Sequence, residues 1–393
     1  MPPKPKAPKG ANDLRALIDL TKTTQDLLAH FQSSLGPSTA LTAQSTLPTA
    51  TTSAPEPNPL DVIRATTTLL KSHTTTLSLL LLTPPLTPPA IISKIGDVSS
   101  GVLSGMVAAA SSVAQPGRKD ELGELMRGEL RAQVRRLLGT WGEVLVLILR
   151  FAERRQGREG EVNGKGKGRD LGPTEAEKQD VLSTTGVLWE ACDTLLKVCD
   201  SGIVGLVVKK AGEWRSVLLD AVEELKEWGE DVDDEDEDDA EGSDAEDGVF
   251  GDEDDIFSAA NKLGKGDKEL KTLLDMSVKR LKMVGILYQA VIKRRLKPFP
   301  DTSSESNGAA EAASSDPMSK LDEVMGLLKS IPETVDELAS AFYDLDEEEA
   351  KQTLGKCGDE AKSVIALVKL SWSGKEDEFT AWSDKWVAAL EAS

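Results

Sequence analysis

Apolar residues recur every three or four positions along most of this chain, which is the period of an amphipathic helix. No segment alternates apolar and polar residues over more than four positions, so the pattern favours helices over strands. The predicted helices cover residues 14–31, 60–82, 88–113, 120–156, 174–199, 204–225, 270–297, 320–329, 332–343, 347–372 and 376–390. We therefore predict an all-α protein built from two helical bundles.

Two of these helices carry start signals. Thr87 precedes Pro88 and Pro89, and proline fits the first helical positions because its missing N–H would be unpaired there. Thr174 and Glu177 have the spacing of a capping box, in which each side chain bonds the other residue's backbone N–H. We expect helices to begin at both points.

An acidic tract over residues 230–255 interrupts the helical pattern. It holds 17 Asp or Glu residues and no Lys or Arg, against a net charge of −21 for the whole chain. Like charges at this density repel one another and resist burial, so we expect a disordered, solvated linker.

Other composition changes divide the chain further, at Pro/Ser/Thr-rich, Gly/Lys/Arg-rich and Ser/Ala/Glu-rich stretches. The predicted organisation is a basic disordered tail over 1–10, an N-terminal bundle over 11–229 with flexible loops near 36–59 and 157–172, the acidic linker over 230–255, and a C-terminal bundle over 256–393 with a flexible loop at 298–317.

The amino-acid composition bears on the kind of core, the kind of partner and the question of membrane insertion. Only 4% of residues are aromatic against 39% hydrophobic, so aliphatic side chains must fill the cores, as in helix-on-helix packing. The acidic balance argues against a nucleic acid partner and favours basic proteins. The apolar runs fall short of the ~20 residues that span a bilayer, and no signal-peptide pattern opens the chain, so we expect no membrane insertion.

The residues that carry enzymatic chemistry are scarce. His30 and His73 are the two histidines, and neither has a metal-ligand spacing. Cys192, Cys199 and Cys357 lie in helical patterns without a CxxC pair, so we expect reduced, buried thiols. We find no phosphate-binding glycine loop and no calcium loop in the acidic tract. The prediction is a noncatalytic protein with no metal and no cofactor.

One heptad is more regular than any other in the chain. Its stripe contains Leu270, Leu274, Ser277, Leu281, Val284, Tyr288 and Val291. Such a stripe could pair with a helix of a partner protein, or it could pack inside its own bundle, because both uses require the same period. The periodicity does not separate these alternatives.

A basic cluster follows the heptad, formed by Lys293, Arg294, Arg295 and Lys297. These cations could offset the dipole at the helix end, act as a nuclear import signal, or contact the acidic tract.

Ser243 lies within the acidic tract and is flanked by acidic residues, a setting favoured by acidophilic kinases of the casein kinase 2 type. We therefore predict Ser243 as a phosphorylation site, where a phosphate would add about 1.5 to 2 negative charges.

Four short segments, in order, resemble the cyclin-D-interacting protein family. They are residues 75–79 (Thr-Thr-Leu-Ser-Leu), 188–192 (Leu-Trp-Glu-Ala-Cys), 220–225 (Asp-Ala-Val-Glu-Glu-Leu) and 335–339 (Val-Asp-Glu-Leu-Ala), the last followed by Phe342 and Tyr343. The resemblance implies two helical bundles of the talin and vinculin kind. It also implies a noncatalytic cell-cycle regulator that binds D-type cyclins and signalling adaptors, with a helix-loop-helix-like capacity to dimerise.

These observations predict an interaction protein of the nucleus and cytoplasm whose helical grooves hold partner helices. Two alternatives stay open: an acidic escort of basic proteins such as histones, and a cytoskeletal adaptor by analogy of fold. The sequence leaves the oligomeric state undetermined.

Overall fold

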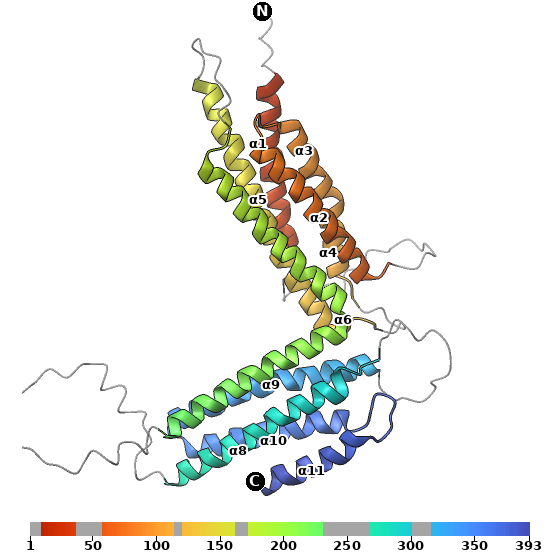
Figure 1. Cartoon of the computed structure of the whole chain (residues 1–393), viewed down its shortest axis with the longest axis vertical. Coiled ribbons are helices and arrows are strands. Elements are labelled where there is room, and N and C mark those ends of the chain that lie inside the picture. Colours follow the sequence, from red (N-terminus) through yellow and green to blue (C-terminus); the bar gives the residue numbers. More distant parts are fainter. Residues whose placement is uncertain (1–8, 37–56, 114–119, 162–171, 231–267, 301–315) are drawn as a thin grey trace, which may run out of the picture. The chain divides into compact units, whose positions relative to one another are not determined.

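The computed structural model describes residues 9–36, 57–113, 120–161, 172–230, 268–300 and 316–393 (Figure 1). Every regular element within these ranges is helical and none is a strand, which confirms the predicted all-α class. The contacts divide the chain into two compact units, Met1–Arg118 with Glu124–Gly202 and Lys119–Gly123 with Ile203–Ser393. Residues 1–8 of the predicted tail, nearly all of the acidic linker and the central parts of the three predicted loops lie outside the described residues, whereas Lys9 and Gly10 of the predicted tail already belong to the first helix.

Unit 1 is a bundle of long helices that run side by side (Figure 1). Its elements are α1 (Lys9–Ser34), α2 (Pro59–Leu82), α3 (Pro88–Asp97), the π-helical turn η2 (Val98–Leu103), α4 (Ser104–Ala110), α5 (Gly123–Glu161) and the first part of α6 (Glu175–Glu230). Its interior is mainly aliphatic, as predicted, with Trp141 of α5 as a fully buried aromatic side chain. Ion pairs tie α2 to α6 at its surface, Lys71 with Asp193 at 2.6 Å and Arg64 with Asp200 at 2.9 Å.

Both predicted start signals in this unit precede helices, although the Thr87 side chain makes no capping hydrogen bond ahead of α3. A further cap, at Asn58, was not predicted. The Asn58 side chain accepts a 2.9 Å hydrogen bond from the Leu60 amide ahead of α2. At the start of α6 the Thr174 amide donates to the Glu177 carboxylate at 2.8 Å, and the Glu177 amide donates to the Thr174 hydroxyl at 3.3 Å. This reciprocal pair is the predicted capping box.

The run from Pro88 to Ala110, formed by α3, η2 and α4, is long and apolar enough to cross a membrane by length and composition. Its mean hydropathy is 1.2, and 39% of it is buried. Ile91, Ile95 and Met106 on this run are fully buried, and the run packs against α1 and α2. A core helix of a bundle needs the same apolar composition.

Gly202 interrupts α6 with a backbone conformation (φ 59°, ψ −166°) that only glycine adopts readily. The helix up to Gly202 belongs to unit 1, and the part from Ile203 belongs to unit 2. The structural division therefore falls at Gly202, whereas the sequence placed the end of the N-terminal bundle at residue 229. The physical reason is that the apolar stripe beyond Gly202, including Leu218 and Leu225, is buried in unit 2.

Unit 2 contains the second part of α6, α8 (Lys268–Val291), the π-helical turn η4 (Ile292–Leu296), α9 (Pro317–Tyr343), α10 (Glu347–Val368) and α11 (Glu378–Ala392). Helices α9 and α10 pack along their lengths, and α8 contacts both of them as well as α11. The second part of α6 is held to α8 where Arg215 Nε donates to the Gly285 carbonyl at 3.0 Å. Trp228 of α6 packs edge-on against Tyr343 of α9, with ring centroids 5.5 Å apart.

One prediction about unit 2 is wrong. The sequence indicated separate helices over 320–329 and 332–343, but α9 continues through Pro332. Proline has no N–H to donate to the carbonyl four residues earlier, which belongs to Leu328. The buried Tyr288 hydroxyl of α8 donates to that carbonyl instead, so the proline leaves no buried acceptor unpaired.

Candidate interaction site

The heptad stripe of α8 lies inside unit 2. Its members are all buried, with at most 4% of each side chain exposed: Leu270, Leu274, Ser277, Leu281, Val284, Tyr288 and Val291. The stripe is therefore the core seam of its own bundle and offers no free surface to a partner helix. The sequence left open whether the stripe pairs with a partner helix or packs inside its own bundle, and in the structure it packs inside the bundle.

The basic cluster is split by the structure. Lys293, Arg294 and Lys297 are exposed, and Arg294 pairs with Glu378 at 2.8 Å. Arg295 is only 1% exposed. Three of the four cations are therefore accessible to a receptor. Arg295 is buried, so it cannot be part of an exposed import signal.

Arg295 joins α8 to the start of α11. Its Nη1 and Nη2 donate to the two carboxylate oxygens of Asp377 at 2.7 and 2.8 Å. Its Nε donates to the Val368 carbonyl at 2.6 Å, and Nη2 also donates to the Lys369 carbonyl at 3.0 Å. The guanidinium lies 4.3 Å from the centroid of the Phe379 ring. A planar five-donor group is the side chain that can satisfy this geometry.

Asp377 serves two purposes at this joint. Its carboxylate accepts hydrogen bonds from the amides of Phe379 and Thr380, and it caps α11 in a capping box with Thr380. The hydrogen bond from Arg295 is the main cause that lowers the pKa of Asp377 to about 2. The start of α11 is therefore fixed by a charge pair as well as by its cap.

The remaining predicted residues show no converging chemistry. Ser243 lies outside the described residues. Cys192, Cys199 and Cys357 are free and buried, and burial raises their pKa values to about 12, 11 and 12. In the part of the chain that the structure describes, no group of three or more His, Cys, Asp or Glu residues could hold a metal ion.

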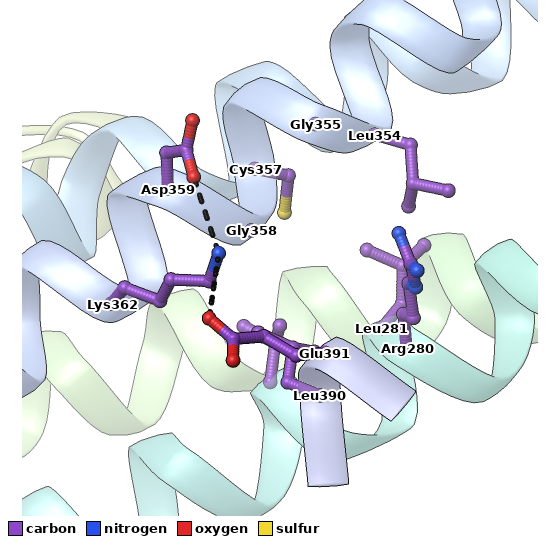
Figure 2. Close-up of a pocket in the computed structure, with 11 residues that line it drawn as sticks. Arg280, Leu281, Leu354, Gly355, Cys357, Gly358, Asp359, Lys362, Leu390 and Glu391 are labelled. Carbon is purple, nitrogen blue, oxygen red and sulfur yellow. Dashed lines mark hydrogen bonds and ion pairs between the residues drawn. The ribbon is translucent and has the colours of Figure 1, made fainter. Parts of the chain in front are cut away.

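The candidate site in unit 2 is a hollow of about 270 Å³ where α8, α10 and the end of α11 meet (Figure 2). It is lined by Arg280, Leu281, Val284, Leu354, Gly355, Cys357, Gly358, Asp359, Lys362, Leu390 and Glu391. Gly355 and Gly358 lie one turn apart on α10, and a Cβ at either position would meet open space. The backbone of α10 is therefore accessible along this hollow.

Charged side chains lie on both sides of the hollow. On one side Lys362 pairs with Asp359 at 3.5 Å and with Glu391 of α11 at 3.6 Å. On the other, Figure 2 shows the Arg280 guanidinium reaching from α8 toward Leu354 of α10. The Arg280 Nε is shielded from solvent and has no hydrogen-bond partner within the described ranges. A buried donor without an acceptor is costly. Because Arg280 as a whole is only half-buried, an acceptor can reach the outer part of its guanidinium.

Helix α11 lies against the same two helices. Trp386 Nε1 donates to the Met283 carbonyl of α8 at 3.0 Å, and Lys369 of α10 pairs with Asp384 at 2.6 Å. Leu390 is buried beside the hollow, and α11 ends at Ala392. The surface formed by α8 and α10 thus already accommodates one amphipathic helix.

Sequence reasoning did not identify Arg280, Gly355 or Gly358. Arg280 lies next to Leu281 of the stripe, and its sequence position gives no sign that its Nε is buried. The one available signal was the pair of glycines within a helical pattern, because each internal glycine costs about 1 kcal/mol relative to alanine.

The architecture defines an all-helical protein, and the hollow in unit 2 is its candidate interaction site. The sequence model of the N-terminal domain of the Grap2 and cyclin-D-interacting family matches residues 62–231. This match confirms the resemblance to the cyclin-D-interacting family, and it covers three of the four motifs that suggested it. An uncharacterized protein of Schizosaccharomyces pombe is 23% identical over 335 residues, which cover 85% of this chain and 84% of the yeast protein.

Proposed function

We propose that this protein is a noncatalytic regulator of cell-cycle progression that binds D-type cyclins and signalling adaptors in the nucleus and cytoplasm. The observation that carries the proposal is the match of residues 62–231 to the Grap2 and cyclin-D-interacting domain. The helical architecture supports it, since amphipathic helices and grooves between them are a recurring means of protein recognition.

The acidic tract contributes the charge preference of the proposed interaction. Residues 230–255 carry most of the net charge of the chain, so they attract basic surfaces over a range that salt shortens to about 10 Å at 0.1 M. Binding through helical surfaces depends much less on ionic strength. This difference separates the proposal from its alternative, in which the tract itself escorts basic proteins such as histones.

The test uses the full chain and a variant in which residues 230–255 are replaced by a Gly/Ser segment of equal length, which keeps the spacing. Binding to a purified D-type cyclin and to core histones is measured by interferometry over a salt series. We expect both forms to bind the cyclin, while any histone binding disappears in the variant. Failure of the intact chain to bind the cyclin would refute the proposal, and cyclin binding that is lost with the tract would favour the electrostatic alternative.

We further propose that Ser243 is phosphorylated by an acidophilic kinase and that Lys293, Arg294 and Lys297 support nuclear import. The acidic flanks of Ser243 support the first idea, and the exposure of the three cations supports the second. Phosphopeptide mapping that finds Ser243 unmodified throughout the cell cycle would remove the first.

A further inference from the structure

The groove between α8 and α10 is longer than the helix that occupies it. At one end Arg295 of η4, directly after α8, donates to the Val368 carbonyl at the end of α10, and Asp377 caps α11 beside them. At the other end Glu269 of α8 acts electrostatically on Lys351 of α10, so the two helices run side by side between these points. Helix α11 stops at the hollow next to Leu281.

Beyond the end of α11 at Ala392, the surface of α8 before Arg280 carries exposed side chains. Met276 is 37% exposed there although it is a large apolar side chain, and Gly355 on the opposite wall is exposed.

The residues around the hollow indicate which side chains a bound helix would need. The almost fully buried side chains of Leu281, Val284 and Leu354 form the floor of the hollow, and charged side chains surround it. An occupant therefore needs an aliphatic side chain with polar groups beside it. Beside this floor the shielded Arg280 Nε has no acceptor. At the far end of the same helix, Arg295 receives a carboxylate from the helix docked there. A carboxylate is the group that matches a guanidinium, so the occupant needs an acidic side chain at this point.

We propose that this open end of the α8–α10 groove binds an amphipathic helix of a protein partner, which inserts an aliphatic side chain into the hollow and pairs a carboxylate with Arg280. The inference rests on the proposed function to the extent that the occupant is a protein. The surface that α11 already occupies continues into the hollow, which supports a helix as the occupant. The Arg280 donor without an acceptor supports an acidic residue on that helix over a basic one.

The glycines beside the hollow also favour a helix as occupant. The absence of Cβ atoms at Gly355 and Gly358 allows a helix backbone to approach α10 closely.

The experiment titrates the full chain with two synthetic helical peptides of 15 residues or so, which form about four turns. Both carry leucines at positions i, i+3 and i+7, and they differ only in a Glu or a Lys one turn from the central leucine. We expect the Glu peptide to bind roughly tenfold more tightly than the Lys peptide, since only the Glu carboxylate can form a charged hydrogen bond with Arg280. Arg280→Glu should reverse this order, and Arg280→Gln should abolish the difference while keeping an uncharged side chain in place.

A pair of glycine variants locates the binding. Gly358→Leu fills the hollow and should prevent binding of the Glu peptide, whereas Gly326→Leu on α9 should not. Both glycines are helical and have open space at the Cβ position, so the two variants make the same local change. Circular dichroism verifies that each variant folds.

Equal affinity for the two peptides, no binding of either at millimolar concentration, or an equal effect of both glycine variants would overturn the inference. A concentration-dependent dimer that Gly358→Leu disrupts would also overturn it, because the occupant would then be a second copy of this chain. D-type cyclin binding is measured in parallel. Cyclin binding without peptide binding removes only the groove inference, and peptide binding without cyclin binding removes only the proposed function.

Discussion

Tyr288 of α8 donates its hydroxyl hydrogen to the carbonyl of Leu328, the residue four positions before Pro332 in α9. The proline deprives this carbonyl of its helical partner. Both groups are shielded from solvent, since Tyr288 and Leu328 are fully buried, and burial raises the pKa of the Tyr288 hydroxyl well above its ordinary value of 10. Two residues on different helices thus compensate for one missing N–H.

Tyr288→Phe should lower the free energy of unfolding by about 1 to 3 kcal/mol, because it leaves a buried carbonyl without a donor. Chemical denaturation of the full chain, followed by circular dichroism, measures the change. Pro332→Ala returns the N–H to α9, so Tyr288→Phe should cost less in that background. Strictly additive effects in this double-mutant cycle would contradict the proposed compensation.

Asp377→Asn isolates the charge at the start of α11, because Asn caps a helix about as well as Asp. We expect a loss of about 1 to 2 kcal/mol, since solvent screens the half-exposed carboxylate and Arg295 keeps its three carbonyl acceptors. The folded-state pKa of Asp377, about 2, lies below the ordinary value of 3.8. Its stabilisation is therefore complete above that ordinary value and disappears as the pH falls toward 2.

Acid titration of the unfolding free energy tests this pH dependence. The wild-type chain should lose more stability between pH 4 and 2 than Asp377→Asn does, so the two curves should converge at low pH. Asp384→Asn is a suitable control, because Asp384 is an exposed ion-pair partner of Lys369. Parallel curves for wild type and Asp377→Asn would contradict the assignment.

The basic cluster needs a test that separates import from stability. The triple variant Lys293→Gln, Arg294→Gln and Lys297→Gln removes only exposed cations and should change the unfolding free energy by less than about 1 kcal/mol. Arg295→Gln should cost about 3 kcal/mol or more, because it removes a buried cation and leaves several acceptors unpaired. Microscopy of the triple variant then reports on import alone. Unchanged nuclear localisation would rule out the import role.

The sequence predicted most of the helices and the capping box of Thr174 and Glu177, because period and capping are local properties. It did not predict the burial of Arg295, since a charged residue at a helix end ordinarily faces solvent. A signal was nevertheless present: Arg295 follows Val291 by four residues and so continues the spacing of the stripe. The continuity of α9 through Pro332 depends on Tyr288, which is 44 residues earlier in the sequence, so no local rule could reveal it.

The hollow beside Arg280 was also beyond sequence reasoning. Its walls come from three helices, and its open end exists because α11 is shorter than α8 and α10. Core stripes and binding stripes share one period, so the pattern of α8 could not show which face stays free. Only the packing shows that the stripe is internal and that the free surface lies beside it.

Gly202→Ala and Gly212→Ala form a matched pair within α6. Neither new Cβ would meet an atom within 4 Å, but Gly202 has φ 59° and ψ −166° whereas Gly212 is helical. We expect Gly202→Ala to destabilise the chain by about 1 to 3 kcal/mol through backbone strain, and Gly212→Ala to stabilise it by up to about 1 kcal/mol. Thermal unfolding by calorimetry should therefore move in opposite directions. A shift of the same sign for both would contradict the strained conformation at Gly202.

The three thiols should react slowly in the folded chain. Burial raises their pKa values from an ordinary 9.0 to about 12 for Cys192 and Cys357 and to about 11 for Cys199. At pH 8 the reactive thiolate is therefore about a thousandfold scarcer at the first two and about a hundredfold scarcer at Cys199 than in the unfolded chain. Mass spectrometry of maleimide labelling should find Cys199 modified first and all three equally fast in guanidinium. Rapid labelling of Cys357 in the folded chain would contradict its place in the core.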